Sequence, residues 1–212
     1  MKLSRTFPRV APLTVVCAAL AIGCTSSTAP LKKDTTVEKL PAQINIVQLS
    51  PTAPALYNTS VSFYAKLGTD REGLISFVDE GGGPGEKYLR LSVDGESLLA
   101  RPDGTPFAAG DSILITVSVS DPTKVLFDMQ PAGLTFSPSH PAHLRIEYAK
   151  ANGDYNHDGH EDSKDKQIKD SLAIWRQATD GDPYSRLSSA NSEESDEIET
   201  TLVSFSRYAI AY

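Results

Sequence analysis

The chain has 212 residues, of which 40% are hydrophobic and 22% are charged, and its formal net charge is −7. This length is enough for one well-buried domain. The acidic balance provides no basic surface for nucleic acid, so we expect no nucleic-acid partner. The only cysteines are Cys17 and Cys24, so the rest of the chain must be held together by its core, a metal ion or both.

The amino terminus has the layout of a secretory signal peptide. Lys2, Arg5 and Arg9 form a basic start, and an apolar stretch over residues 11–22 follows. This stretch is too short to be interpreted as a membrane-spanning helix. We therefore expect residues 1–23 to be a signal peptide that is removed on export. Their removal takes away three basic residues and lowers the formal charge from −7 to −10.

The string LAIGC at residues 20–24 resembles the lipobox of bacterial lipoproteins. The resemblance implies cleavage before Cys24 and lipidation of its thiol by a diacylglyceryl group with acyl chains such as palmitate. The expected location is the bacterial cell envelope, with the protein held on a membrane through this N-terminal lipid. Thr25 and Ser26 carry no acidic retention signal for the inner membrane, which favours the outer membrane. The alternative is an ordinary secretory signal peptide in which the cysteine occurs by chance.

Residues 24–41 are rich in Ser, Thr, Pro and Lys and lack apolar periodicity, which predicts a lipidated flexible tether. Strand patterns dominate from residue 42 onward, and turn residues separate them. The predicted strand runs are 44–49, 61–65, 74–78, 88–93, 113–119, 125–127, 144–148, 172–175 and 202–211. Asp94-Gly95 predicts a hairpin turn after the 88–93 run. Residues 42–212 are thus predicted to form an all-β domain, an antiparallel β-sandwich with at most short helical segments, one of them near residues 166–171.

The segment DYNHDGHEDSKD at residues 154–165 carries the clearest chemical signal. Oxygen-bearing side chains alternate over its first five positions, and Gly159 follows at the sixth, as in the first half of an EF-hand loop. The predicted calcium ligands are Asp154, Asn156, Asp158, the backbone carbonyl of His160, Asp162 directly or through water, and Asp165. Aspartate at the twelfth position resembles the loops of dockerin modules.

The segments that flank this loop do not predict a complete EF-hand. Residues 144–148 and 173–176 read as strands, so we expect a lone calcium loop between strands with half a turn of helix at most behind it. Clustered carboxylates repel one another, which favours a bound cation. One alternative is an acidic, solvated insertion that binds nothing. His157 and His160 suggest a transition metal as another alternative, but the neighbouring hard oxygen ligands favour calcium.

From Tyr88 onward the order of features resembles the ZU5 domain, a β-sandwich family. The resemblance is carried by MQPAGLTFSPSHPAHLRIEY at residues 129–148, LAIWR at 172–176 and VSFSRYAIAY at 203–212. It implies a sandwich and names no ligand. Some ZU5 domains cleave themselves at a His-Phe-Ser tripeptide in the closing strand. This chain has the serine, Ser206, but Ser204 stands in the place of the histidine, so we expect no cleavage and a buried Phe205.

The string GDSIL at residues 110–114 resembles the nucleophile block of GDSL-type esterases. Under this alternative Ser112 is the nucleophile, His157 the base and Asp154 its orienting acid. In those enzymes, however, the serine follows a parallel strand and opens a helix, whereas Ser112 precedes an alternating strand. We therefore expect no catalytic residues. The preferred interpretation is a non-enzymatic envelope lipoprotein that binds calcium and supports, or binds, an unidentified envelope protein or glycan. The esterase and a self-cleaving ZU5-type module are the alternatives.

Overall fold

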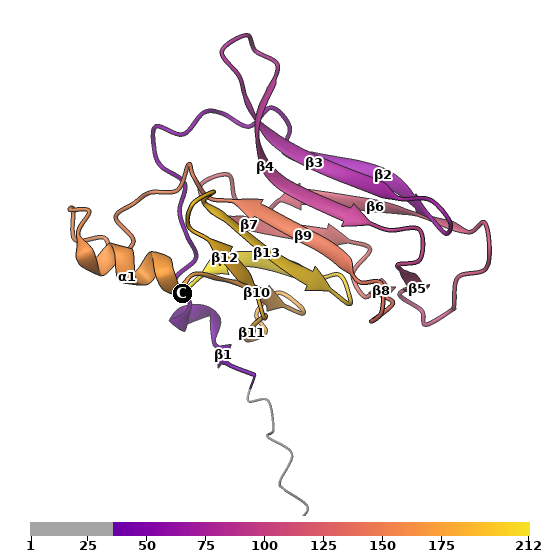
Figure 1. Ribbon diagram of the computed structural model, residues 1–212. Coiled ribbons are helices and arrows are strands. Elements are labelled where there is room, and N and C mark those ends of the chain that lie inside the picture. The colour runs from indigo at the N-terminus through magenta and orange to yellow at the C-terminus, as the bar shows by residue number, and fades with distance from the viewer. Residues whose placement is uncertain (1–35) are drawn as a thin grey trace, which may run out of the picture. The chain divides into compact units, whose positions relative to one another are not determined.

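The computed structural model describes residues 36–212, which form antiparallel β-sheets and a single α-helix (Figure 1). This confirms the predicted all-β sandwich-like fold. The predicted signal peptide (residues 1–23), Cys24 and most of the predicted tether lie outside the described residues. None of the helical segments within residues 36–212 combines the length and the apolar character needed to cross a membrane.

Two large sheets and one small one account for the strands. The seven-stranded sheet has the order β1 (Glu38–Lys39), β11 (Tyr184–Arg186), β10 (Ala173–Gln177), β14 (Arg207–Ala211), β7 (Leu126–Gln130), β6 (Ser112–Val119) and β2 (Ser60–Lys66). The five-stranded sheet has the order β12 (Ala190–Ser192), β13 (Glu197–Leu202), β9 (Ala142–Glu147), β4 (Pro84–Val93) and β3 (Arg71–Val78). β5 (Leu98–Ala100) pairs with β8 (Thr135–Phe136), and the helical segments are η1 (Pro41–Gln43) and α1 (Ser163–Ser171).

The core lies between the two large sheets because their strands alternate apolar and polar side chains. Ile115 and Val117 of β6 are fully buried, as are Leu89 and Leu91 of β4 in the other sheet. All four belong to one apolar cluster. Successive side chains of a strand point to opposite faces, so the residues between them line the outer surfaces of the sheets.

The chain changes sheets between β13 and β14. The prediction of a single closing strand over residues 202–211 is therefore wrong: β13 pairs with β9 in the five-stranded sheet, whereas β14 pairs with β10 and β7. Phe205 is buried at the crossing, with its ring centroid 4.8 Å from that of Phe136. An apolar run indicates burial but not the partner strand, so the sequence pattern could not reveal this switch.

Two other predicted elements differ from the structure. The 44–49 segment is not a strand, because Ile46, Gln48 and Leu49 form isolated bridges to three different parts of the chain. Asp94-Gly95 is not a hairpin turn between neighbouring strands, because β5 pairs with β8 rather than with β4. Instead, the Gly95 N–H donates to Asp70 Oδ1 over 2.8 Å, which ties this turn to the β2–β3 connection.

A second, smaller apolar cluster covers the outer face of the seven-stranded sheet around Trp175. The indole Nε1 donates to the carbonyl of Ala211 over 3.0 Å, and Ile44 packs against the same cluster. Lys39 Nζ lies 5.3 Å from the centre of the indole ring. Glu38 and Lys39 pair with β11. The predicted flexible tether therefore ends earlier than residue 41, because pairing with a strand and packing near an indole fix its last residues.

Candidate calcium loop

The 154–165 loop lies between β9 and β10 and runs directly into α1. The strand on its entering side agrees with the prediction. The expectation of half a turn of helix behind it is wrong, because α1 has nine residues and begins at Ser163. Asp162 caps the helix: its Oδ1 accepts a hydrogen bond from Lys164 N over 2.7 Å, and Asp165 Oδ2 accepts one from Asp162 N over 3.0 Å. This reciprocal arrangement is a capping box with Asp in place of the usual Glu or Gln.

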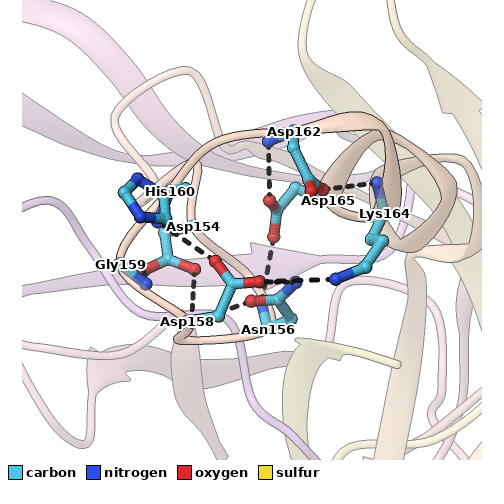
Figure 2. A network of polar contacts seen from close by, with 8 residues as sticks. All are labelled: Asp154, Asn156, Asp158, Gly159, His160, Asp162, Lys164 and Asp165. Carbon is cyan, nitrogen blue, oxygen red and sulfur yellow. Dashed lines mark hydrogen bonds and ion pairs between the residues drawn. The ribbon is translucent and has the colours of Figure 1, made fainter.

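The side-chain oxygens of the first half of the loop point into its interior, as Figure 2 shows. Asp154 accepts hydrogen bonds from Asp158 N over 3.1 Å and from Gly159 N over 2.8 Å. Asn156 Oδ1 also accepts from Asp158 N, over 2.8 Å. Gly159 has a φ of +90°, a left-handed conformation that suits glycine. These bonds close the turn around the oxygens of Asp154, Asn156 and Asp158.

Asp165 joins the two ends of the loop. Its Oδ1 accepts from Asn156 N over 3.0 Å and its Oδ2 from Asp162 N over 3.0 Å. The side chain is buried, with 4% of the residue exposed. The N–H groups of Asp162 and Asn156 hold the pKa of the Asp165 carboxyl below its usual range, in that order of importance.

The loop carboxylates have little compensating positive charge. Among residues 36–212, the one ion pair to a carboxylate of residues 154–165 joins Lys164 Nζ to Asp158 Oδ2 over 3.7 Å. The Lys164 side chain is 69% exposed, so solvent screens this contact. Carboxylate and carboxamide oxygens are the ligands that calcium prefers, and each keeps a second lone pair beside its present hydrogen bond. The donor set of the loop is therefore chemically suited to calcium.

The side chains of the six predicted ligand residues do not all point in the same direction. Asp154, Asn156, Asp158 and Asp165 point inward, whereas the His160 imidazole points away from the interior of the loop (Figure 2). The Asp162 carboxylate caps α1. Within residues 36–212, no three His, Cys, Asp or Glu side chains are grouped closely enough to hold a metal ion. The carboxylates of Asp154 and Asp165 accept hydrogen bonds from backbone N–H groups. The Asn156 carboxamide and the backbone carbonyl of His160 are further oxygen donors of a kind that calcium accepts.

Aromatic residues attach the loop to the core, and the sequence analysis missed this. Tyr155, the second loop residue, is 6% exposed and belongs to the main apolar cluster. The Tyr212 hydroxyl donates to the carbonyl of Tyr155, and the two rings meet edge to face with centroids 6.4 Å apart. Burial, followed by the charges of Asp196, Glu161 and Asp165, raises the pKa of Tyr155 to about 12. The signal in the sequence that could have predicted this attachment is Tyr155, an aromatic residue in an otherwise polar loop.

The carboxyl end of α1 is held by the turn before β13. Lys169 Nζ lies 2.6 Å from Asp196 Oδ1, and the carbonyl of Lys169 accepts a hydrogen bond from Asn191 Nδ2 over 3.0 Å. A pocket of about 500 Å³ opens between the loop and α1, and Tyr148 and Glu161 contribute to its lining. The loop therefore lies between two fixed supports, the core at Tyr155 and the strand turn at Asp196.

The structure does not bring the esterase residues together. Ser112 is the first residue of β6, whereas the last, Val119, pairs with Phe127 at the start of β7. That end of β7 pairs with the later part of β14, which leads to Tyr212 and the loop. The eight residues of β6 rise about 25 Å in total. Ser112 and His157 consequently lie toward opposite ends of the seven-stranded sheet.

The residues of the self-cleavage motif lie at the crossing between the sheets. Ser206 is buried, and its hydroxyl has no hydrogen-bond partner within residues 36–212. The carbonyl of Ser204 accepts a hydrogen bond from the Tyr208 hydroxyl. Phe205 is buried in the core, as expected.

Comparison with known proteins gives no match: no protein-family model, no curated protein and no solved structure is similar to the chain. The resemblances to the ZU5 family, to dockerin loops and to the lipobox therefore remain predictions from the sequence.

The depressed pKa of Asp165 predicts a pH-dependent contribution to stability. A carboxyl whose pKa is lower in the folded state stabilises above its unfolded pKa of about 4 and loses this effect as the pH falls through the folded value. We expect Asp165→Asn to lower the melting temperature at neutral pH, because a carboxamide offers one acceptor oxygen to two N–H donors. The difference from the wild type should shrink below about pH 4.

The measurement is thermal unfolding in chelator between neutral and acidic pH. Asp170→Asn, an exposed change in the same helix, is the control and should leave the profile unchanged. An Asp165→Asn deficit of equal size at every pH would show that the carboxylate charge is not the stabilising feature.

Proposed function

We propose that the chain is a non-enzymatic lipoprotein of the bacterial cell envelope, in which an antiparallel β-sandwich carries one calcium ion in the 154–165 loop. The observation that carries the proposal is the loop itself. Four of its oxygen-bearing side chains point inward, and one of them is a buried carboxylate. Among residues 36–212, a single, exposed lysine is their counter-charge. A divalent cation coordinated by these oxygens relieves the repulsion between them.

The calcium ion is proposed to act structurally rather than in a reaction. Asp154, Asn156, Asp158 and Asp165 hold it through side chains, His160 through its carbonyl, and Asp162 directly or through water. Because Tyr155 and Tyr212 join the loop to β14, an ion in the loop also stabilises the closing strand of the sandwich. The proposed role of the domain is to bind an envelope protein or glycan, or to support one structurally.

Lipidation of Cys24 is proposed to anchor the domain to a membrane, with the outer membrane favoured. β1 begins at Glu38, so residues 25–37 separate the lipid from the fold. A chain of this length spans at most about 45 Å when fully extended. The sandwich is therefore expected to work close to the membrane surface rather than at the end of a long stalk.

Calcium is expected to raise the melting temperature of the domain. At a concentration about 100 times the dissociation constant, a ligand of the folded state stabilises by about 2.7 kcal/mol. For a domain of this size the corresponding shift is roughly 5–11 °C. The measurement is thermal unfolding of residues 36–212, which form one compact unit, in calcium and then in chelator. Asp154→Ala/Asp158→Ala should abolish the shift.

Asp79→Ala is the matched control for this experiment. Asp79 Oδ1 accepts hydrogen bonds from Gly81 N over 2.9 Å and Gly83 N over 2.7 Å, so it also closes a turn with its carboxylate. The Asp79→Ala domain should be less stable but keep the full calcium shift. Equal melting temperatures of the wild type in calcium and chelator would contradict the calcium proposal.

The lipid anchor is tested separately by Cys24→Ser. A thiol is the acceptor of the lipid, so the serine variant should lose membrane association and remain in the soluble fraction after export. Mass spectrometry of the purified wild-type protein should find the diacylglyceryl group on Cys24 at the new amino terminus. A mature wild-type protein without lipid would support the ordinary secretory signal instead.

A further inference from the structure

α1 is held in place by polar contacts at its two ends rather than by apolar packing along its length. Asp165 is its one buried residue, and Ile168 is its one apolar side chain that packs, partly buried, against the core. A helix of nine residues is shorter than the roughly 12–15 residues at which an isolated helix becomes marginally stable in water. The placement of α1 therefore depends on the contacts at its ends.

The amino end of α1 is part of the proposed calcium loop. Asp165 is both the ligand proposed at the last position of the loop and the third residue of the helix. Asp162, another proposed ligand, is the N-cap of the same helix. A cation held by the loop oxygens thus fixes the first turn of α1, and a displaced α1 would carry Asp165 away from the other ligands.

The carboxyl end of α1 is held by Asn191, the central residue of β12 (Figure 1). Asn191 Nδ2 donates to the carbonyl of Lys169 over 3.0 Å, and Asn191 Oδ1 accepts from the Tyr148 hydroxyl over 2.7 Å. A backbone carbonyl can only accept, so the first bond fixes the orientation of the carboxamide. Tyr148 is 2% exposed and belongs to the main apolar cluster. Asn191 therefore connects the end of α1 to the core of the sandwich.

The turn between β12 and β13 adds a second contact to the same end. Lys169 Nζ lies 2.6 Å from Asp196 Oδ1, and the carbonyl of Asp196 accepts a hydrogen bond from Tyr148 N over 2.7 Å. β12 pairs with β13, and Asn191 lies opposite Ile198. Asn191 and Asp196 thus belong to one hairpin, and this hairpin holds α1 at Lys169.

We propose that Asn191 is a positioning residue for calcium, and that α1 couples the 154–165 loop to the β12–β13 hairpin. The inference rests on the proposed calcium site. When the hairpin holds the carboxyl end of α1, Asp165 is already in place and calcium binding has less to order. Calcium in the loop in turn fixes the amino end of α1 and favours the contacts of the hairpin. Such a coupling acts equally in both directions.

The first test is calorimetric titration of residues 36–212 with calcium. In Asn191→Ala the carboxyl end of α1 loses its bond to β12, so the dissociation constant for calcium should rise at least about fivefold. Asn58→Ala is the matched control. Its carboxamide also ties strands together, through bonds to Ser60 O, Leu74 O and Ser76 N, but it makes none to α1. This variant should lose stability and keep the calcium affinity of the wild type.

Two failures of this titration are distinguishable. A wild-type domain that does not bind calcium contradicts the proposed site and the coupling together. A wild type that binds calcium, with an Asn191→Ala variant that binds it equally tightly, overturns the coupling alone. If Asn191→Ala does not fold, Tyr148→Phe takes its place, because phenylalanine keeps the ring in the core and removes the hydroxyl bond to Asn191. Its dissociation constant should also rise, and an unchanged value would refute the proposal.

The reverse direction of the coupling is measured by hydrogen exchange in calcium and in chelator. Calcium should slow exchange of the β12 amides more than that of the β3 amides, which lie at the other edge of the same sheet. The preference for β12 should disappear in Asn191→Ala. Equal slowing of the two edges in the wild type, or a preference for β12 that the variant retains, would show that α1 does not transmit binding to the hairpin.

Discussion

The candidate site depends on the two hydrogen bonds that the Asp165 carboxylate accepts. One of its oxygens accepts the N–H of Asn156 and the other accepts the N–H of Asp162. The first bond closes the loop, and the second completes the cap of α1. A buried carboxylate held by N–H groups is costly to protonate or remove, because its donors would lose their partners. Loop and helix therefore form one unit whose geometry follows from a single side chain.

The sandwich provides the rigid frame for this unit. Tyr155 enters the core, and the Tyr212 hydroxyl reaches back to its carbonyl, so the loop is joined to the end of β14. At the other end of α1, Lys169 and Asp196 form the second support.

Features that depend on residues close together in the sequence were predicted better than features that depend on which distant segments become neighbours. Alternation along β4 and β6 gave the fold class, and the spacing of Asp154, Asn156, Asp158 and Gly159 indicated a loop whose oxygens point inward. The nine-residue helix was underestimated because Asp165 completes its capping box in place of the usual Glu or Gln. The crossing at residues 203–206 depends on which strands become neighbours. Local periodicity does not contain that information.

The most direct test of the central claim is binding of terbium, a luminescent substitute for calcium, to residues 36–212. Burial, followed by the charges of Asp165 and Asp154, raises the pKa of Tyr212. Tyr155 belongs to the loop, and its carbonyl accepts the Tyr212 hydroxyl, so both phenols lie near the loop carboxylates. Excitation of tyrosine should therefore sensitise terbium emission that saturates at one ion per chain and disappears on addition of calcium. The emission should be absent in Asp154→Ala/Asp158→Ala. Emission that the variant retains, or that calcium does not displace, would contradict a calcium site in this loop.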